Sequence, residues 1–453
     1  MSIQAPVYTL GFVQSMLTEQ SGRASGWFKD MELRTVFQPA FSLPHKKAVG
    51  FEASLRGTDE DGSAIAPEAM FGPVDNFSET CLLDLLGTTV HVHNFAASRS
   101  LQGLLFLNLH PEVILDHEHS ARFLRTLFAH YRIPKYRVVL DIPGYLLKLE
   151  RLDSAIEAYR ALGCLISIDD LGVENSDLDS VVRTGPDVVK IDHSVVASAV
   201  ANQSVRQRLL HAVSLLHEMG TLVLLEGVES KAEALMAIEA DADFASGFYF
   251  GPLYQDVDEF DEPGSVLDSL WVSYKETPGP GSARNALLEN ADEESIYAAH
   301  TRKLRSASPA DIHRYRDERR PFFAAIQEAG ALMEAGAGLE AACSEFLRVK
   351  GAIRCFLLGS DGAQIGPELP GTAPPAPKGM NVAGLIEAVD GDWSRRDFFR
   401  RAMREPEAVQ VTRRYRSLTG YVHCVTFSIA TRINGKPLVI CGDVDWSALA
   451  PIH

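Results

Sequence analysis

Residues 164–192 read CLISIDDLGVENSDLDSVVRTGPDVVKID and contain two short apolar runs. The first run ends in Asp169 and Asp170, and the second carries Lys190 near its end. Continuous rather than alternating apolar runs are typical of strands that are covered on both faces, as in a parallel sheet. The stretch therefore predicts two buried strands whose ends carry side chains that can do chemistry.

The same pattern extends in both directions along the chain, from Val36 to about Leu253. Further apolar runs are AVGFEASL (48–55), LLFLNL (104–109), VVLDI (138–142), LVLLEGV (222–228) and FYFGP (248–252). Segments with helical spacing separate the runs, at residues 78–98, 118–131, 150–162, 204–220 and 231–240. Strands that alternate with helices in this way form either a doubly wound open sheet or a closed barrel.

The polar residues at the strand ends decide between these two folds. They are Glu52, Asn108, Asp141, Asp169, Asp170, Lys190 and Glu226. In a closed (β/α) barrel the carboxyl ends of the strands meet at one mouth, whereas an open sheet spreads them along an edge. Neither GxGxxG nor GxxxxGK[ST] follows the first run, so the usual nucleotide-binding open sheets lack their signature. The sequence predicts an α/β fold with a TIM-like (β/α) barrel.

Several carboxylates and one carboxamide at a common point repel each other unless cations neutralise them. Oxygen ligands favour Mg²⁺ or Mn²⁺ over zinc, and two such ions can activate water for phosphodiester cleavage. Taken singly, an acidic residue at a strand–helix junction is more often a salt-bridge partner or a helix N-cap. We expect His110 to support the site residues or to have a packing role instead of being a ligand, and His193 to be a loop residue without a role in the chemistry.

The C-terminal half differs in composition from the barrel region. Residues 276–285, ETPGPGSARN, read as a linker, and a helical region follows from Ala286 to about Met333. Its basic stretch around Arg319 has interleaved acids and reads as a solvated helix face. Beyond it we expect an antiparallel α+β domain with hairpins at Asp361-Gly362 and Asn434-Gly435, a helix in 393–406 and strands in 408–417, 421–433 and 436–446. The predicted parts are a barrel domain (1–275), a linker and helical region (276–335) and the α+β domain (336–453).

Composition limits the classes of function. The chain has 453 residues, 46% of them hydrophobic, and a formal charge of −17, values that exclude collagen-like, coiled-coil and wholly disordered proteins. An acidic chain repels polyanions, so we expect no sequence-independent binding of nucleic acid or membrane surfaces. The six cysteines form no CxxC pair and three lie in apolar runs, which indicates buried free thiols and a cytoplasmic location. We also expect no leader peptide and no membrane span.

The motifs resemble those of EAL domains, which are bacterial phosphodiesterases and receptors for cyclic di-GMP. The resemblance begins with FQPAFSLPHKKAVGFEASLRG (37–57) and continues in family order through LLFLNLHP, VVLDIP, LISIDDLG, GPDVVKIDHSVV, LLEGVES and ASGFYFGPL. It implies a TIM-like barrel with a Mg²⁺ or Mn²⁺ two-metal site in which Ca²⁺ is an inhibitory substitute. By resemblance, the first metal is bound by Glu52, Asn108, Asp141 and Asp169, and the second by Asp170. The resemblance also implies that Lys190 orients the water and that Glu226 belongs to the metal–water network, with support from Glu229. It further implies that Arg56 holds a ligand phosphate and that Gln38 lies where the ligand pocket opens.

The sequence departs from the family pattern at several of these positions. The signature triplet is Glu52-Ala53-Ser54, Asp141 and Gly144 stand where the family has glutamates, Glu174 replaces a glycine, and Ser246 replaces a glutamine at the ligand pocket. Residues that support metal ligands typically change metal affinity or activity by about 10–100-fold. We therefore expect cyclic di-GMP binding with weak or conditional hydrolysis, and a higher rate after Asp141→Glu combined with Gly144→Glu. A fully active phosphodiesterase regulated by its C-terminal domain is the alternative, and a scaffold without ligand binding is a third reading.

The C-terminal part more weakly resembles PAS/Cache-like sensory domains, through DFFRRAMREP, YVHCVTFSIAT and VICGDVDW. A plain dimerisation or scaffold module is the alternative. The expected partners are cyclic di-GMP, a second copy of the chain and a downstream protein. We expect the loop Leu171–Leu178, next to the family's dimer contact, to be mobile and to couple the two halves through the helical region.

Overall fold

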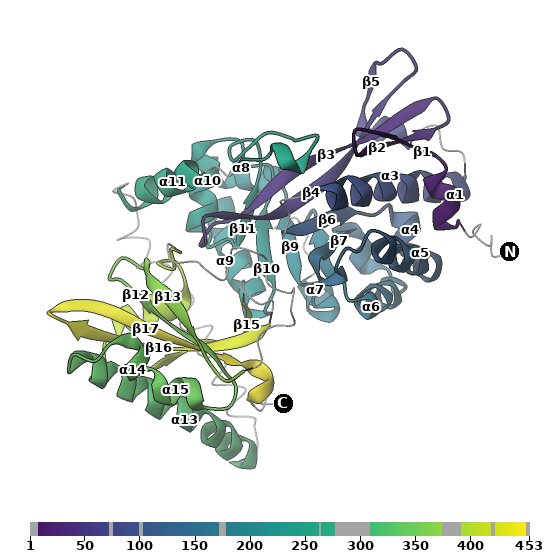
Figure 1. Ribbon diagram of the computed structural model, residues 1–453. Helices are drawn as coiled ribbons and strands as arrows, with labels where there is room; N and C mark the ends of the chain where they lie inside the picture. The colour runs from purple at the N-terminus through teal and green to yellow at the C-terminus, as the bar shows by residue number, and fades with distance from the viewer. Residues whose placement is uncertain are drawn as a thin grey trace. The chain divides into compact units, whose positions relative to one another are not determined.

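The computed structural model describes residues 8–71, 76–98, 103–171, 178–261, 264–276, 309–373, 391–417 and 422–449 (Figure 1). The described chain forms two compact units. The first runs up to Leu43 and from Lys47 to Gly264, and the second comprises Pro44–Lys46 and the described residues from Ser265 onward.

The first unit is built on a closed barrel. Its eight strands are β3 (Met31–Ser42), β4 (Lys47–Thr58), β6 (Leu104–Asn108), β7 (Val138–Pro143), β8 (Leu165–Asp169), β9 (Val188–Ile191), β10 (Leu222–Leu225) and β11 (Phe244–Ser246). Neighbours from β4 to β11 are parallel, and β3 closes the ring by pairing antiparallel with both β4 and β11. The predicted TIM-like barrel is therefore confirmed, with one antiparallel strand that the sequence did not indicate.

All five predicted helical segments in this unit form helices. They are α3 (Phe77–Ala97), α5 (His117–His130), α6 (Leu152–Leu162), α9 (Gln203–Glu218) and α10 (Lys231–Glu239). Local chemistry fixes their ends: Ser230 and Glu233 form a reciprocal capping box at the start of α10, and α6 stops at Gly163 with φ of 93°. The wholly buried strands between them, such as β9 and β10, lie under these helices as a covered sheet must.

The prediction of a strand at FYFGP (248–252) is wrong. The last barrel strand is β11, at Phe244–Ser246, and a turn follows it. Gly247 has φ of 148°, and a Cβ atom there would lie 2.2 Å from the backbone nitrogen of Val228, so the chain must leave the strand at this residue.

The sheet also extends further toward the N-terminus than the expected start at Val36. An antiparallel hairpin of β1 (Leu17–Gln20) and β2 (Arg23–Phe28) pairs with β3 outside the ring, and β5 (Ala64–Ile65) pairs with β4. The remaining elements of the unit are α1 (Leu10–Gln14), α2 (Pro67–Met70), α4 (Pro111–Leu115), α7 (Leu178–Thr184), α8 (His193–Ala201) and the 3-10 helices η1 (Lys135–Arg137), η2 (Gly144–Lys148) and η3 (Val257–Glu259).

The second unit contains an antiparallel sheet in the order β13-β12-β17-β16-β14, with β15 also paired to β16. The strands are β12 (Ala352–Leu358), β13 (Gln364–Pro370), β14 (Gln410–Val411), β15 (Tyr415–Arg416), β16 (His423–Ile433) and β17 (Lys436–Asp445). Both expected hairpins form, and Asn434 and Gly435 have φ of 52° and 78°, as a two-residue turn requires. The single strand expected in 408–417 is instead two short strands, and the expected helix is α16 (Asp397–Arg404).

Helix α13 (Pro309–Glu334) shares one hydrophobic core with this sheet. The ring of Phe322 lies 5.5 Å from those of Phe346 and Phe427, which belong to α15 (Ser344–Arg348) and β16. Residues 309–334, predicted within the separate region 276–335, thus pack with residues assigned to 336–453. Arg319 is buried over the ring of Trp446 instead of lying on a solvated face.

Most of the expected linker, the start of the helical region and Glu174 lie outside the described residues. The remaining helices are α11 (Gly264–Glu276), α14 (Leu339–Ala342) and the 3-10 helix η4 (Trp446–Ala448).

All six cysteines are buried and free, as expected. Among the described helices, none combines the length and the hydropathy that a bilayer crossing needs.

Candidate metal centre at the barrel mouth

Lys190 lies at the centre of the predicted site. Its Nζ atom is 2.7 Å from Glu226 Oε1, 3.0 Å from Glu52 Oε2, 3.1 Å from Asp141 Oδ2 and 3.9 Å from Asp169 Oδ1. The lysine side chain is fully buried. The barrel therefore brings together residues from β4, β7, β8, β9 and the end of β10 that are far apart in the sequence.

One ammonium group among four carboxylates leaves an excess of negative charge. Burial lowers the pKa of Lys190, but Asp141 and the other three acids outweigh this and raise it well above its usual value. Burial, with Glu52 and Asp169, raises the pKa of Asp141 to about 7 and that of Glu226 well above its usual value. The pKa of Glu52 is lowered, because Lys190 and Asn108 outweigh its burial. This cluster is an environment that favours a bound cation.

Asn108 is positioned to offer an oxygen to such a cation. Its Nδ2 atom donates a hydrogen bond to Glu52 Oε1 over 2.8 Å. Because the amide nitrogen faces Glu52, the carbonyl oxygen at the other end of the group remains for another ligand. Asn108 is also the register partner of Asp141 across β6 and β7.

Asp169, Asp170 and Glu226 form the tightest group of potential ligands. One oxygen from each lies within 4.8 Å of the other two. Asp170 has φ of 54°, and its backbone N–H donates to Asp169 Oδ1 over 2.9 Å, so both carboxylates belong to one tight turn at the end of β8. The family resemblance assigns Asp169 to a first metal, Asp170 to a second metal and Glu226 to the metal–water network.

Two orphaned buried atoms show that a divalent cation fits this donor set. Among the described residues, neither Asp141 Oδ1 nor Ser167 Oγ has a hydrogen-bond partner, although both are buried. Asp141 and Ser167 are register partners on β7 and β8. Buried polar atoms are normally satisfied, so these point to an additional polar or ionic group, and a donor set made only of oxygen suits Mg²⁺, Mn²⁺ or Ca²⁺.

The predicted ligand-binding residues occupy the strands around this cluster. Gln38 pairs with Glu52 across β3 and β4, and Arg56 lies four residues beyond Glu52, past the end of the β4–β6 pairing. The Nη1 atom of Arg56 donates to Leu55 O over 2.8 Å. Ser246 is buried at the end of β11.

Glu229 lies in the loop that joins β10 to α10. Its side chain is exposed, and its backbone N–H donates to Glu233 Oε2 over 2.7 Å. It is the third residue after Glu226, so it belongs to the loop that carries a candidate metal ligand.

The prediction that His193 is a loop residue is wrong. It is the first residue of α8, capped by Asp192, and not a loop residue. A Cβ atom on Gly227, which has φ of 62°, would lie 2.6 Å from His193 Cβ, so the histidine packs directly on the backbone next to Glu226. The sequence contained a signal for this helix start, because Asp192 before a helical pattern is a typical N-cap.

The ring of His110 stacks on the ring of Phe71 with a centroid distance of 4.9 Å, which is a packing role.

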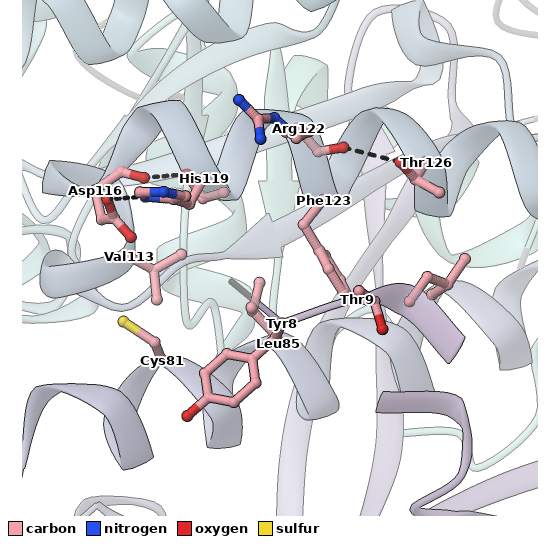
Figure 2. A pocket seen from close by; sticks show the side chains of 12 residues that line it. Tyr8, Thr9, Cys81, Leu85, Val113, Asp116, His119, Arg122, Phe123 and Thr126 are labelled. Atoms are coloured by element: carbon pink, nitrogen blue, oxygen red, sulfur yellow. Dashed lines mark hydrogen bonds and ion pairs between the residues drawn. The ribbon is translucent and has the colours of Figure 1, made fainter. Parts of the chain in front are cut away.

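Two cavities in the described part of the first unit are lined by none of the predicted site residues. One, of about 260 Å³, is lined by α3, α5 and the segment around α1; in Figure 2 Asp116 bonds to His119 beside Tyr8, Cys81 and Phe123. A second, of about 290 Å³, is lined by polar residues that include Arg23 and Asp256.

Comparison with known proteins places this barrel in a family. The EAL domain family matches residues 22–252, just over half of the chain. The EAL-domain containing protein YkuI of Bacillus subtilis is 28% identical over 222 residues, 47% of this chain and 53% of its own. The probable cyclic di-GMP phosphodiesterase PdeN of Escherichia coli is 26% identical over 238 residues, 49% of this chain and 43% of its own.

A crystal structure of YkuI in complex with cyclic di-GMP and calcium covers 92% of this chain and 96% of its own, with a TM-score of 0.49 and 18% identity. In the sequence comparison, the chain spans only about half the length of these two curated relatives. The family match and the closed barrel agree, and the chain belongs to the EAL domain family.

Proposed function

We propose that this chain is a cyclic di-GMP-binding signalling protein in which hydrolysis of the ligand to linear pGpG is weak or conditional. The observation that carries the proposal is the four carboxylates around buried Lys190 together with Arg56 beyond the mouth. The relationship to the probable phosphodiesterase PdeN supports the choice of ligand.

The proposed cations are Mg²⁺ or Mn²⁺, with Ca²⁺ as an inhibitory substitute. The residues proposed to hold them are Glu52, Asn108, Asp141, Asp169 and Asp170, with Glu226 beside them. Such ions, when bound as a pair, would supply activation of a water molecule and stabilisation of the leaving oxygen in phosphodiester hydrolysis. Lys190, fixed by its four acidic neighbours, orients that water and neutralises charge on the phosphate. Gln38, Arg56 and Ser246 are proposed to bind the ligand, and Glu229 to support the loop after Glu226.

Arg56 provides the first test. Arg56→Glu is expected to weaken cyclic di-GMP binding by at least about 2 kcal/mol, because a phosphate loses its charge-assisted partner and meets a carboxylate. Calorimetric titration in Ca²⁺ measures this loss. The control is Arg34→Glu, which makes the same charge change at the register partner of Arg56 on β3, where the side chain is 58% exposed. Equal losses in both variants would show a general charge effect and refute the assigned role of Arg56.

Asp141 provides the second test, on the strength of hydrolysis. An aspartate is one methylene shorter than the family glutamate, and metal–oxygen distances tolerate only about 0.2 Å. We expect wild-type turnover to be slow and faster with Mn²⁺ than with Mg²⁺, which demands near-ideal octahedral geometry. Asp141→Glu is expected to raise the rate about tenfold, measured as release of pGpG. A wild type that works equally fast with both metals and is not improved by Asp141→Glu would contradict this account.

A fully active phosphodiesterase is the second candidate function. The intact cluster around Lys190 favours it, because none of the central charges is lost. In that case the C-terminal unit, which we propose to be a PAS/Cache-like sensory domain, regulates the barrel.

We further propose that the protein is cytoplasmic, that it signals to a downstream protein and that the barrel forms a homodimer. Tyr145 and Val182, which are 67% and 59% exposed, lie on η2 and α7, two elements that contact each other. Two large exposed apolar side chains on neighbouring elements support an association surface. The oligomeric state measured by light scattering for wild type and Tyr145→Lys tests this part.

A further inference from the structure

Gly144 lies in close contact with the backbone that carries the two aspartates. It directly follows Pro143, the register partner of Asp169, and it begins η2. A Cβ atom on Gly144 would lie 2.9 Å from the carbonyl oxygen of Asp169, 3.6 Å from that of Asp170 and 3.7 Å from Ile168 Cγ2. The first distance is shorter than real Cβ contacts allow, and its partner is backbone, so a side chain here forces the end of β8 to move.

The same segment is held from the opposite side by β9. The N–H of Leu171 donates to the carbonyl of Lys190 over 3.1 Å, and Leu171 itself is buried. The Asp169–Asp170 segment therefore lies between Gly144, directly after β7, and Lys190 on β9. These contacts on both sides leave the segment little space to move away from an added Cβ atom.

The carbonyl that a Cβ would strike belongs to the peptide plane joining Asp169 to Asp170. Because this plane is rigid, a displaced carbonyl also moves the N–H of Asp170. That N–H holds Asp169 Oδ1 at 2.9 Å, and Asp170 is already in the left-handed region. One added methyl group therefore acts on both carboxylates of the tightest ligand group.

We propose that Gly144 is a positioning residue that sets the geometry of the Asp169–Asp170 pair for cation binding. The inference rests on the proposed metal-dependent function. It also overturns the expectation that Gly144→Glu assists the site, because glutamate introduces the same Cβ atom.

The test is the rise in melting temperature that added Ca²⁺ causes, with no nucleotide present. Cation binding stabilises the folded state according to its concentration relative to the dissociation constant. For Gly144→Ala we expect at least a tenfold higher Ca²⁺ concentration to be needed for the same rise as in the wild type. A merely structural residue would lower the melting temperature at every Ca²⁺ concentration and leave the Ca²⁺-dependent rise unchanged, and that result would overturn the proposal.

Two further variants make the test specific. Gly11→Ala adds the same methyl group in the same unit where nothing lies within 4 Å, and its Ca²⁺ response is expected to equal that of the wild type. Gly144→Ala with Ile168→Ala removes Ile168 Cγ2, which lies 3.7 Å from the added Cβ atom, and so gives that atom room to move away from the Asp169 carbonyl; this variant is expected to recover part of the response. No recovery in the double variant counts against the positioning role. A wild type without any Ca²⁺ response refutes the metal centre itself, which separates failure of the proposed function from failure of this inference.

Discussion

Lys190→Met is expected to destabilise the metal-free barrel by about 3–5 kcal/mol. Removing one partner of a buried ion pair leaves an uncompensated buried charge, and here the ammonium group faces four carboxylates within 4 Å. The methionine fills nearly the same volume, so the loss reports charge more than packing. Urea denaturation in the presence of a chelator measures it. Lys148→Met, at an exposed lysine of η2, is the control and is expected to change stability by less than about 0.5 kcal/mol.

Divalent cations are expected to restore much of the stability of Lys190→Met. Without the ammonium group the carboxylates attract a cation more strongly, so the Ca²⁺-dependent rise in melting temperature is expected to exceed that of the wild type, while turnover is lost. A variant that is destabilised but gains no more from Ca²⁺ than the wild type would show that the ammonium group of Lys190 does not compete with the cation for these carboxylates.

Arg354→Leu is expected to have an effect of similar size in the C-terminal unit. The arginine is buried between β12, β13 and β17, with Nε 2.7 Å from Asp443 Oδ2 and Nη1 2.7 Å from Glu368 Oε1. Asp443 is also held by Thr426. Loss of the guanidinium leaves two buried carboxylates without a cation, which costs about 3–5 kcal/mol.

The two compact units make a specific prediction about this loss. It is expected in the unfolding transition of the C-terminal unit, while the Ca²⁺ response of the barrel stays as in the wild type. Calorimetric melting with and without Ca²⁺ measures both. Arg348→Leu, at an arginine that is 73% exposed, is the control. If Arg354→Leu abolishes the Ca²⁺ response as well, the barrel does not bind its cation independently of the C-terminal unit.

The polar strand ends were sufficient to predict the barrel and the residues of its mouth, because parallel strands in a closed ring must converge there. Lys190 and Asp169 are separated by a helix and a loop in the sequence, yet the topology requires them to meet. The last barrel strand was predicted at the wrong residues, because FYFGP is more apolar than the three residues of β11. Only the turn at Gly247, which approaches Val228, excludes a strand at those residues.

The misjudged details of the site depend on contacts between distant segments. Gly144 reads as a lost glutamate in the sequence, and its approach to Asp169 arises only when β7 and β8 pair. His193 reads as a residue after a strand, and its packing on Gly227 arises only when α8 lies against the loop from β10. Neither contact leaves a local pattern, whereas strand ends and N-caps do.

Calorimetric titration of the wild-type chain with cyclic di-GMP in the presence of Ca²⁺ tests the central claim most directly. The account predicts saturable heat that disappears in Arg56→Glu and decreases when a chelator removes the cation. A titration without heat, on protein whose melting temperature does not rise with cyclic di-GMP, would contradict both the receptor and the enzyme reading of this barrel.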